Sequence, residues 1–161
     1  MDQLIAELQA RFPALRFAPA DYFSWSPETG EIFYEAGRND EQARWSLLHE
    51  SGHALAGHRS YRADVELLRL EVDAWERARQ LAVELGLAID EEHIQECLDT
   101  YRDWLYKRSI CPTCGTKSLQ QGDFVHYRCF NCNAVWRVSA SRFCRAYRRS
   151  KNVSQEAIHL L

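Results

Sequence analysis

The 161-residue sequence has no long hydrophobic run. No apolar stretch approaches the ~20 residues that a membrane-spanning helix needs, so we expect no membrane association. Residues 1–12 are amphipathic and contain acids, and they have no central apolar run like that of a signal peptide. Internal repeats and low-complexity segments are also missing. These absences predict a cytoplasmic globular protein with one ordinary domain, or one domain and a small appendage.

Acidic residues are scarce in the C-terminal part of the chain. Residues 107–151 hold ten basic residues and a single acid, Asp123, which gives a net charge of +9. Residues 1–106 hold 10 basic and 21 acidic residues, which gives a net charge of −11. The overall net charge of −3 hides this division. It predicts two functional parts, of which the second faces an anionic partner.

A short motif in the acidic part indicates a metal site. Residues 43–58 contain no proline and are rich in leucine and alanine, so they predict a helix. The pattern H-E-x-x-H places His49 and His53 four residues apart on one face of that helix, where both imidazoles can bind one ion. Glu50 lies beside them and can accept a proton from a metal-bound water. The alternative is an ordinary helix with two hydrogen-bonded histidines.

A catalytic zinc ion has three protein ligands and a water, so the motif lacks one ligand. His58 lies nine residues after His49, on the opposite side of a continued helix. A second helix is predicted over 64–85, and Glu66 and Asp73 fall on its polar face. Glu71 falls within its apolar stripe, where a carboxylate is costly unless it binds a metal. We therefore choose Glu71 as the third ligand; the alternative is that it pairs with an arginine at the edge of the stripe.

The segments around the motif predict a mixed α+β fold. We expect an amphipathic helix ended by Pro13, a short strand stopped by Pro19, a β-hairpin, and a loop in which Asn39 or Asp40 caps the motif helix. The hairpin strands are predicted at 22–25 and 31–35, and a third helix is predicted at 90–107. Gly52, Ala74 and Ala78 are small enough to let the second helix approach the motif helix. We expect 31–35 to be the edge strand that pairs with an extended peptide.

Four cysteines in the basic part have the spacing of a zinc ribbon. Two C-x-x-C pairs are separated by fourteen residues and consist of Cys111, Cys114, Cys129 and Cys132. Four thiolates form a closed tetrahedral site, which is structural rather than catalytic. Because a unit of this size buries little hydrophobic core, zinc must supply part of its folding energy. The alternative is that the cysteines form disulfides. Strands are predicted at 118–121, 124–127 and 134–138, and a basic helix at 139–149.

The wider pattern resembles the ImmA/IrrE family of zinc metallopeptidases. The resemblance covers roughly residues 1–86 and rests on 30–34, on the H-E-x-G-H helix, and on Glu71-Val72-Asp73-Ala74, which is similar to a gluzincin E-x-x-A signature. It implies a zincin-like fold with His49, His53 and Glu71 as zinc ligands and Glu50 as the base. It also implies a regulatory protein as substrate. Trp75 stands where the family commonly has a small polar residue, and the ribbon is not part of the usual family domain.

These observations predict a zincin-like metallopeptidase domain over 1–108, a zinc ribbon with a basic segment over 109–151, and a tail over 152–161. The function we expect is zinc-dependent endopeptidase activity on a cytosolic protein or peptide substrate, with one catalytic and one structural Zn²⁺. The ribbon would recruit substrate or nucleic acid. One alternative is a SprT-like protease that acts on DNA-bound proteins, which expects a third histidine; the other is a zinc-binding adaptor without catalysis.

Overall fold

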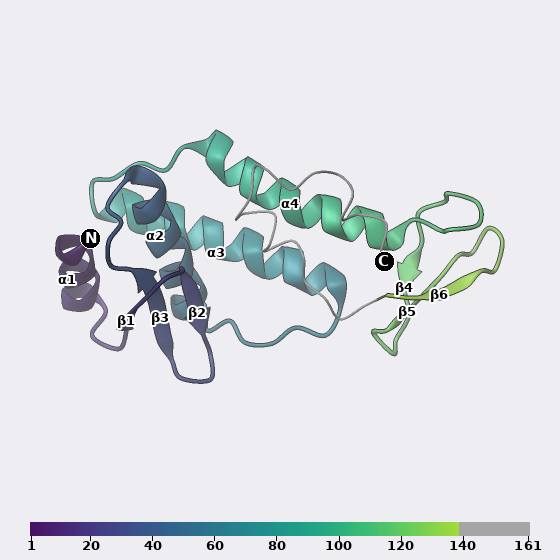
Figure 1. The fold of residues 1–161 in the computed structure, drawn as a ribbon, viewed down its shortest axis with the longest axis horizontal. Helices are drawn as coiled ribbons and strands as arrows, with labels where there is room; N and C mark the ends of the chain where they lie inside the picture. Colours follow the sequence, from purple (N-terminus) through teal and green to yellow (C-terminus); the bar gives the residue numbers. More distant parts are fainter. Residues whose placement is uncertain (139–161) are drawn as a thin grey trace. The chain divides into compact units, whose positions relative to one another are not determined.

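The computed structural model describes residues 1–138, and the predicted basic helix at 139–149 and the tail at 152–161 lie outside them. The described chain has a mixed α+β fold, as the sequence predicts, and its elements run α1, β1, β2, β3, α2, α3, α4, β4, β5, β6 (Figure 1). None of its helices is long and apolar enough to cross a membrane.

The chain divides into two compact units. The first consists of Met1–Ser60 and Arg69–Ile94, and the second of Tyr61–Leu68 and the chain from Gln95 on. Helices α3 (Asp64–Glu84) and α4 (Glu91–Ser109) each contribute residues to both units.

A helix and a three-stranded sheet begin the first unit. These elements are α1 (Asp2–Arg11), β1 (Arg16–Ala20), β2 (Ser24–Ser26) and β3 (Glu31–Glu35). Strands β2 and β3 form the predicted antiparallel hairpin, which Gly30 closes at a φ of +69° with its N–H donating to the Ser26 carbonyl. The strand order is β1-β3-β2, with β1 parallel to β3.

The prediction that residues 31–35 form an edge strand is wrong. Strand β3 is the central strand of this sheet because β1 pairs with its other side. Strand β2 is an edge strand of the three. The prediction also ended β1 before Pro19, but the strand continues to Ala20. Proline lacks an N–H and is tolerated on an edge strand such as β1.

Helix α2 (Glu41–Leu55) carries the motif and lies in the core of the first unit. Asp40 caps it, as one of the two predicted caps, by accepting a hydrogen bond from the Ala43 N–H at 2.9 Å. Apolar side chains of β3, α2 and α3 fill the surrounding core, among them Ile32, Leu47, Leu48, Ala74 and Ala78. The fold therefore buries one face of the motif helix against apolar side chains.

The second unit contains a small antiparallel sheet of strand order β4-β5-β6. Its strands are β4 (Leu119–Gln120), β5 (His126–Arg128) and β6 (Val135–Arg137), shorter than the predicted segments but at the same places. Leu67 and Tyr101 form an apolar cluster of their own in this unit. A buried polar network joins Asp64 to the Arg108 guanidinium and to the Tyr127 hydroxyl, each at 2.8 Å.

Candidate metal centres

Helix α2 turns two imidazoles toward the same point. His49 and His53 lie four residues apart and are buried, with ring centroids 4.7 Å apart and Nε2 atoms 3.2 Å apart. Two such nitrogens on adjacent turns of one helix face can serve as ligands of one ion.

Helix α3 supplies the third donor. Glu71 is 1% exposed, and its Oε2 atom lies 3.1 Å from His49 Nε2 and 3.7 Å from His53 Nε2. Helices α2 and α3 come close at Gly52, because a Cβ there would lie closer than 3.0 Å to the Ala74 carbonyl oxygen. The small residues thus permit the approach that brings Glu71 to the two rings. The structure brings together the three residues chosen as ligands from the sequence.

The spacing of these three atoms fits a zinc ion. Zinc binds nitrogen and oxygen donors at about 2.0–2.2 Å, so two ligand atoms of a tetrahedral site lie about 3.3–3.6 Å apart. The observed separations of 3.1, 3.2 and 3.7 Å lie around that value. Two histidines and one glutamate form a donor set found in catalytic zinc sites, with the fourth position open to water. We call these three residues the donor triangle.

The electrostatics of the donor triangle also suit a cation. Burial would raise the pKa of Glu71, but hydrogen bonds with His49 and His53 outweigh burial and hold that pKa well below its ordinary value of 4.5. The pKa of His49 is lowered from 6.5, chiefly by burial. Both directions favour an ionised carboxylate and a neutral imidazole near neutral pH. These are the protonation states that metal binding requires.

Glu50 is buried next to His49 and contacts the sheet. Its Oε2 atom accepts a hydrogen bond from the backbone N–H of Trp25 in β2 at 2.8 Å. The edge strand β2 is therefore held against the motif helix at the residue that the sequence predicts to be the base. One carboxylate oxygen is oriented by this bond, and a carboxylate has a second oxygen that can accept a proton.

His58 is a neighbour of the donor triangle that the helix-based reasoning missed. Helix α2 ends at Leu55, and Gly57 at a φ of +67° reverses the chain in a Schellman motif, with the His58 N–H bonded to the His53 carbonyl at 3.0 Å. His58 Nδ1 then lies 2.8 Å from His53 Nδ1. Helical periodicity could not place His58, but a glycine two residues past the last helical residue signals this reversal.

Trp75, which departs from the pattern of the family that the sequence resembles, is a second neighbour of the donor triangle. Its ring is 2% exposed and stacks on His49 with centroids 4.2 Å apart and an angle of 27°. Within residues 1–138, His49 Nδ1 and Trp75 Nε1 are buried without a hydrogen-bond partner. The His49 ring is therefore restrained by stacking on Trp75 and not by a hydrogen bond at Nδ1.

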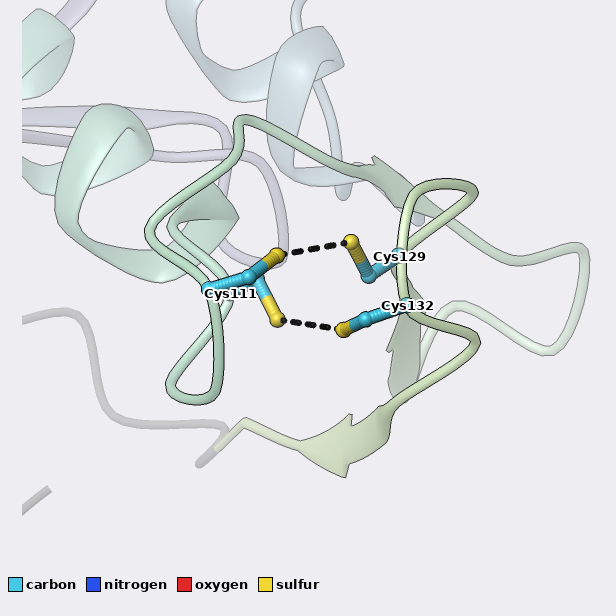
Figure 2. A group of neighbouring side chains, drawn as sticks. Cys111, Cys129 and Cys132 are labelled. Carbon is cyan, nitrogen blue, oxygen red and sulfur yellow. Dashed lines mark hydrogen bonds between the residues drawn. The ribbon is translucent and has the colours of Figure 1, made fainter.

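The four cysteines form a second candidate metal centre. Their Sγ atoms all lie within 4.8 Å of one another, and the Cys111–Cys132 and Cys114–Cys129 pairs are each 3.5 Å apart. Figure 2 shows Cys111, Cys129 and Cys132 turned toward one another between the two C-x-x-C turns. We call these turns, residues 111–114 and 129–132, the knuckles. The sulfur separations are far above the ~2.05 Å of a disulfide and near the ~3.8 Å expected for four thiolates on one tetrahedral zinc. A metal centre therefore fits these residues better than disulfide pairing does.

The knuckles follow one design. In the first, Cys111 N–H bonds to the Thr116 carbonyl, and in the second, Cys129 N–H bonds to the Ala134 carbonyl, at 3.0 and 2.9 Å. Hydrogen bonds from Thr116 and then from Asn131 lower the pKa of Cys114 from 9.0 to about 5. These side-chain hydrogen bonds favour the thiolate form of Cys114, which is the form that binds metal.

Comparisons with known proteins identify no relative. No family model matches the chain, and no curated protein and no solved structure compared with it gives a match. The two candidate metal centres are therefore the features of this chain that bear on its chemistry.

Proposed function

We propose that this protein is a zinc-dependent endopeptidase with a zincin-like first unit of the ImmA/IrrE type. The observation that supports this most is the buried donor triangle, with Glu50 next to it on the same helix. A buried carboxylate that faces two imidazoles is explained by a shared cation, since burying it without one is costly.

The residues of the site have distinct roles in hydrolysis. His49, His53 and Glu71 would hold zinc, which when bound lowers the pKa of its water to near neutrality and polarises a carbonyl. Glu50 accepts a proton from the attacking water and passes it to the leaving amine. The hydrogen bond from the Trp25 N–H keeps the Glu50 carboxylate oriented for both transfers.

Strand β2 is the best candidate for positioning an extended peptide. It is an edge strand of the sheet, and an edge strand can pair with an added strand, although the N–H of Trp25 is already donated to Glu50. The contact between Trp25 and Glu50 brings this edge to the proposed base. A peptide added along β2 would therefore run past the group that receives the proton.

The two alternatives are less well supported. A SprT-like protease expects a third histidine ligand, but the third donor is Glu71, and His58 contacts His53 through Nδ1, away from the donor triangle. An adaptor without catalysis uses Glu50 only for its hydrogen bond with the Trp25 N–H. We therefore keep the endopeptidase as the proposal.

Metal analysis and one substitution test this function. We expect two zinc ions per chain and one after His49→Ala. Glu50→Gln should keep both ions and abolish cleavage of a peptide library analysed by mass spectrometry, whereas Glu41→Gln, in the first turn of α2, should cleave like wild type. The proposal would be contradicted if wild-type protein held only one zinc ion and His49→Ala still held it. Full cleavage by Glu50→Gln would also contradict it.

We propose further that the ribbon recruits single-stranded nucleic acid through the outer face of its sheet. Strand register places Leu119, Arg128 and Val135 in one row across this face, and all three are exposed. Arg137 lies on the same face, and the Phe130 ring is 68% exposed beside the Arg128 guanidinium. Cations next to an exposed ring suit phosphate neutralisation and base stacking.

Fluorescence anisotropy with a labelled oligonucleotide tests the ribbon. Phe130→Ala should weaken binding about tenfold, since one stacked base contributes about 1–3 kcal/mol. Arg128→Gln should lower the salt slope by about 0.7, the value for one phosphate contact on a single strand. Arg102→Gln, an exposed arginine of α4, is the matched control. Wild-type protein that binds no oligonucleotide would point to a protein partner instead.

A further inference from the structure

The two imidazoles of the donor triangle are held in different ways. Each ring has one nitrogen, Nε2, that faces the other donors. The second nitrogen of His53 lies 2.8 Å from His58 Nδ1, whereas that of His49 has no hydrogen-bond partner within the described chain. Only the His53 ring is thus tied to a hydrogen-bonded neighbour through its far side.

The contact at His53 continues to a carboxylate. His58 Nε2 lies 2.8 Å from Asp73 Oδ2, so the order of groups is His53, His58, Asp73. His58 is 8% exposed, but the Asp73 side chain is 63% exposed. The chain of contacts therefore starts in the dry interior and ends at the surface of α3.

The backbone of His58 is fixed independently of its ring. Its N–H bonds to the His53 carbonyl in the reversal after α2, and its carbonyl accepts a hydrogen bond from Trp25 Nε1 at 2.8 Å. The ring is thus presented to His53 from a backbone held on both sides. A substitution of the side chain leaves these two backbone bonds in place.

The geometry fixes which nitrogen of each of the two rings, His53 and His58, carries the proton. A metal-binding Nε2 must present a lone pair, so the proton of neutral His53 is on Nδ1 and is donated to His58 Nδ1. His58 Nδ1 is then an acceptor, so its own proton is on Nε2 and is donated to Asp73. Any other arrangement of neutral rings sets two N–H groups or two lone pairs against each other.

We propose that His58 and Asp73 are positioning residues that lock His53 in the tautomer and orientation needed to bind zinc. This inference rests on the proposed zinc site, because it concerns a ligand of that ion. Partners of this kind typically change metal affinity 10–100-fold when they are removed. Here the partner of the ligand is itself an imidazole, and the carboxylate acts one residue further away.

Zinc affinity at the donor triangle, measured by chelator competition, tests the proposal. The donor-triangle ion is told apart from the ribbon ion because His49→Ala removes only the former. His58→Leu keeps the bulk but no polar atom, and we expect its affinity to fall about 10–100-fold. His58→Gln can accept from His53 through Oε1 and donate to Asp73 through Nε2, so it should stay within about threefold of wild type. If His58 only fills space, the two variants will bind zinc equally, and the proposal is wrong.

An exposed variant guards against misfolding of the buried ones. Asp73→Ala should weaken zinc binding about tenfold, near the lower end of the range for such partners. Asp99→Ala is the matched control, because Asp99 is a helical carboxylate that is 64% exposed and pairs with one cation, Arg102. Equal zinc affinity of the two variants would remove Asp73 from the positioning role.

Proton positions can also be read directly. Long-range proton–nitrogen correlation spectra of the zinc-bound protein should show the proton on Nδ1 of His53 and on Nε2 of His58. A proton on Nδ1 of His58 would overturn the proposal. If wild-type protein binds no zinc at the donor triangle, the proposed function fails; if it binds zinc and the variants bind it equally well, only the positioning role fails.

Discussion

Gly52→Ala tests the helix contact that brings the donor triangle together. The added Cβ would lie closer than 3.0 Å to the Ala74 carbonyl oxygen and 3.2 Å from its carbonyl carbon. Both atoms belong to the backbone of α3, so no side chain can rotate to make room. The two helices must therefore move apart by about 1 Å to bring that oxygen into ordinary contact at 3.4 Å or more.

The expected change in the free energy of unfolding of Gly52→Ala follows from two opposing effects. Overpacking of a tight contact costs about 1–3 kcal/mol, and a rigid backbone neighbour places this site at the upper end. Alanine in place of glycine returns about 1 kcal/mol of helix propensity. The net loss is about 2 kcal/mol, which lowers Tm by about 4–8 °C in a chain of this size.

Zinc binding should respond more than stability does. Metal–ligand distances tolerate about ±0.2 Å, so a larger displacement of α3 takes Glu71 out of bonding range of an ion held by His49 and His53. We expect a loss of at least tenfold in zinc affinity at the donor triangle, with the ribbon zinc unchanged. Chelator competition and calorimetry measure the two effects.

Gly37→Ala is the matched control for this substitution. A Cβ at Gly37 meets no atom within 4 Å, so the same change of residue is made without a clash. If Gly52→Ala matches Gly37→Ala in both Tm and zinc affinity, the close approach of α2 and α3 is refuted. A lower Tm with full zinc affinity would show that the contact contributes to stability but does not set the position of Glu71.

Three further predictions follow from single contacts. Glu71→Gln keeps the volume but removes the charge, so metal analysis should find one zinc ion per chain, that of the ribbon. Arg108→Met leaves Asp64 buried without its ion pair, and denaturant unfolding should show a loss of about 3–5 kcal/mol. Burial and then the hydrogen bond to Asp64 raise the pKa of Tyr127 above 10.0, so the folded state holds this proton more tightly than the unfolded state. Stability should therefore fall as pH rises above about 10, and less so in Tyr127→Phe.

Local patterns were enough to predict the elements of the first unit. Asp40 and the following proline-free run, which is rich in leucine and alanine, place α2, and the polar turn between two aromatic segments places the β2–β3 hairpin. Both features depend on residues close together in the sequence, so propensity and capping determine them. The order of strands does not depend on such patterns, which is why the central position of β3 was not predicted.

The three side chains of the donor triangle could be predicted from the sequence, but their neighbours could not. Glu71 stands out because a carboxylate within an apolar stripe is a local anomaly. His58 shows no such anomaly, since its position depends on the reversal at Gly57 rather than on helical spacing. The bond from Trp25 to Glu50 joins residues 25 positions apart, and no local pattern encodes that pairing.

The packing of α2 against α3 and the geometry of the metal site are one feature of this fold. Ala74 follows Glu71 by three residues and lies one turn along α3, while Gly52 lies between His49 and His53 on α2. The depth to which Gly52 and Ala74 approach each other therefore sets the distance from the carboxylate to the two rings. A larger residue at either position changes core packing and ligand distance together. The small residues around the motif thus bear directly on the position of the third donor.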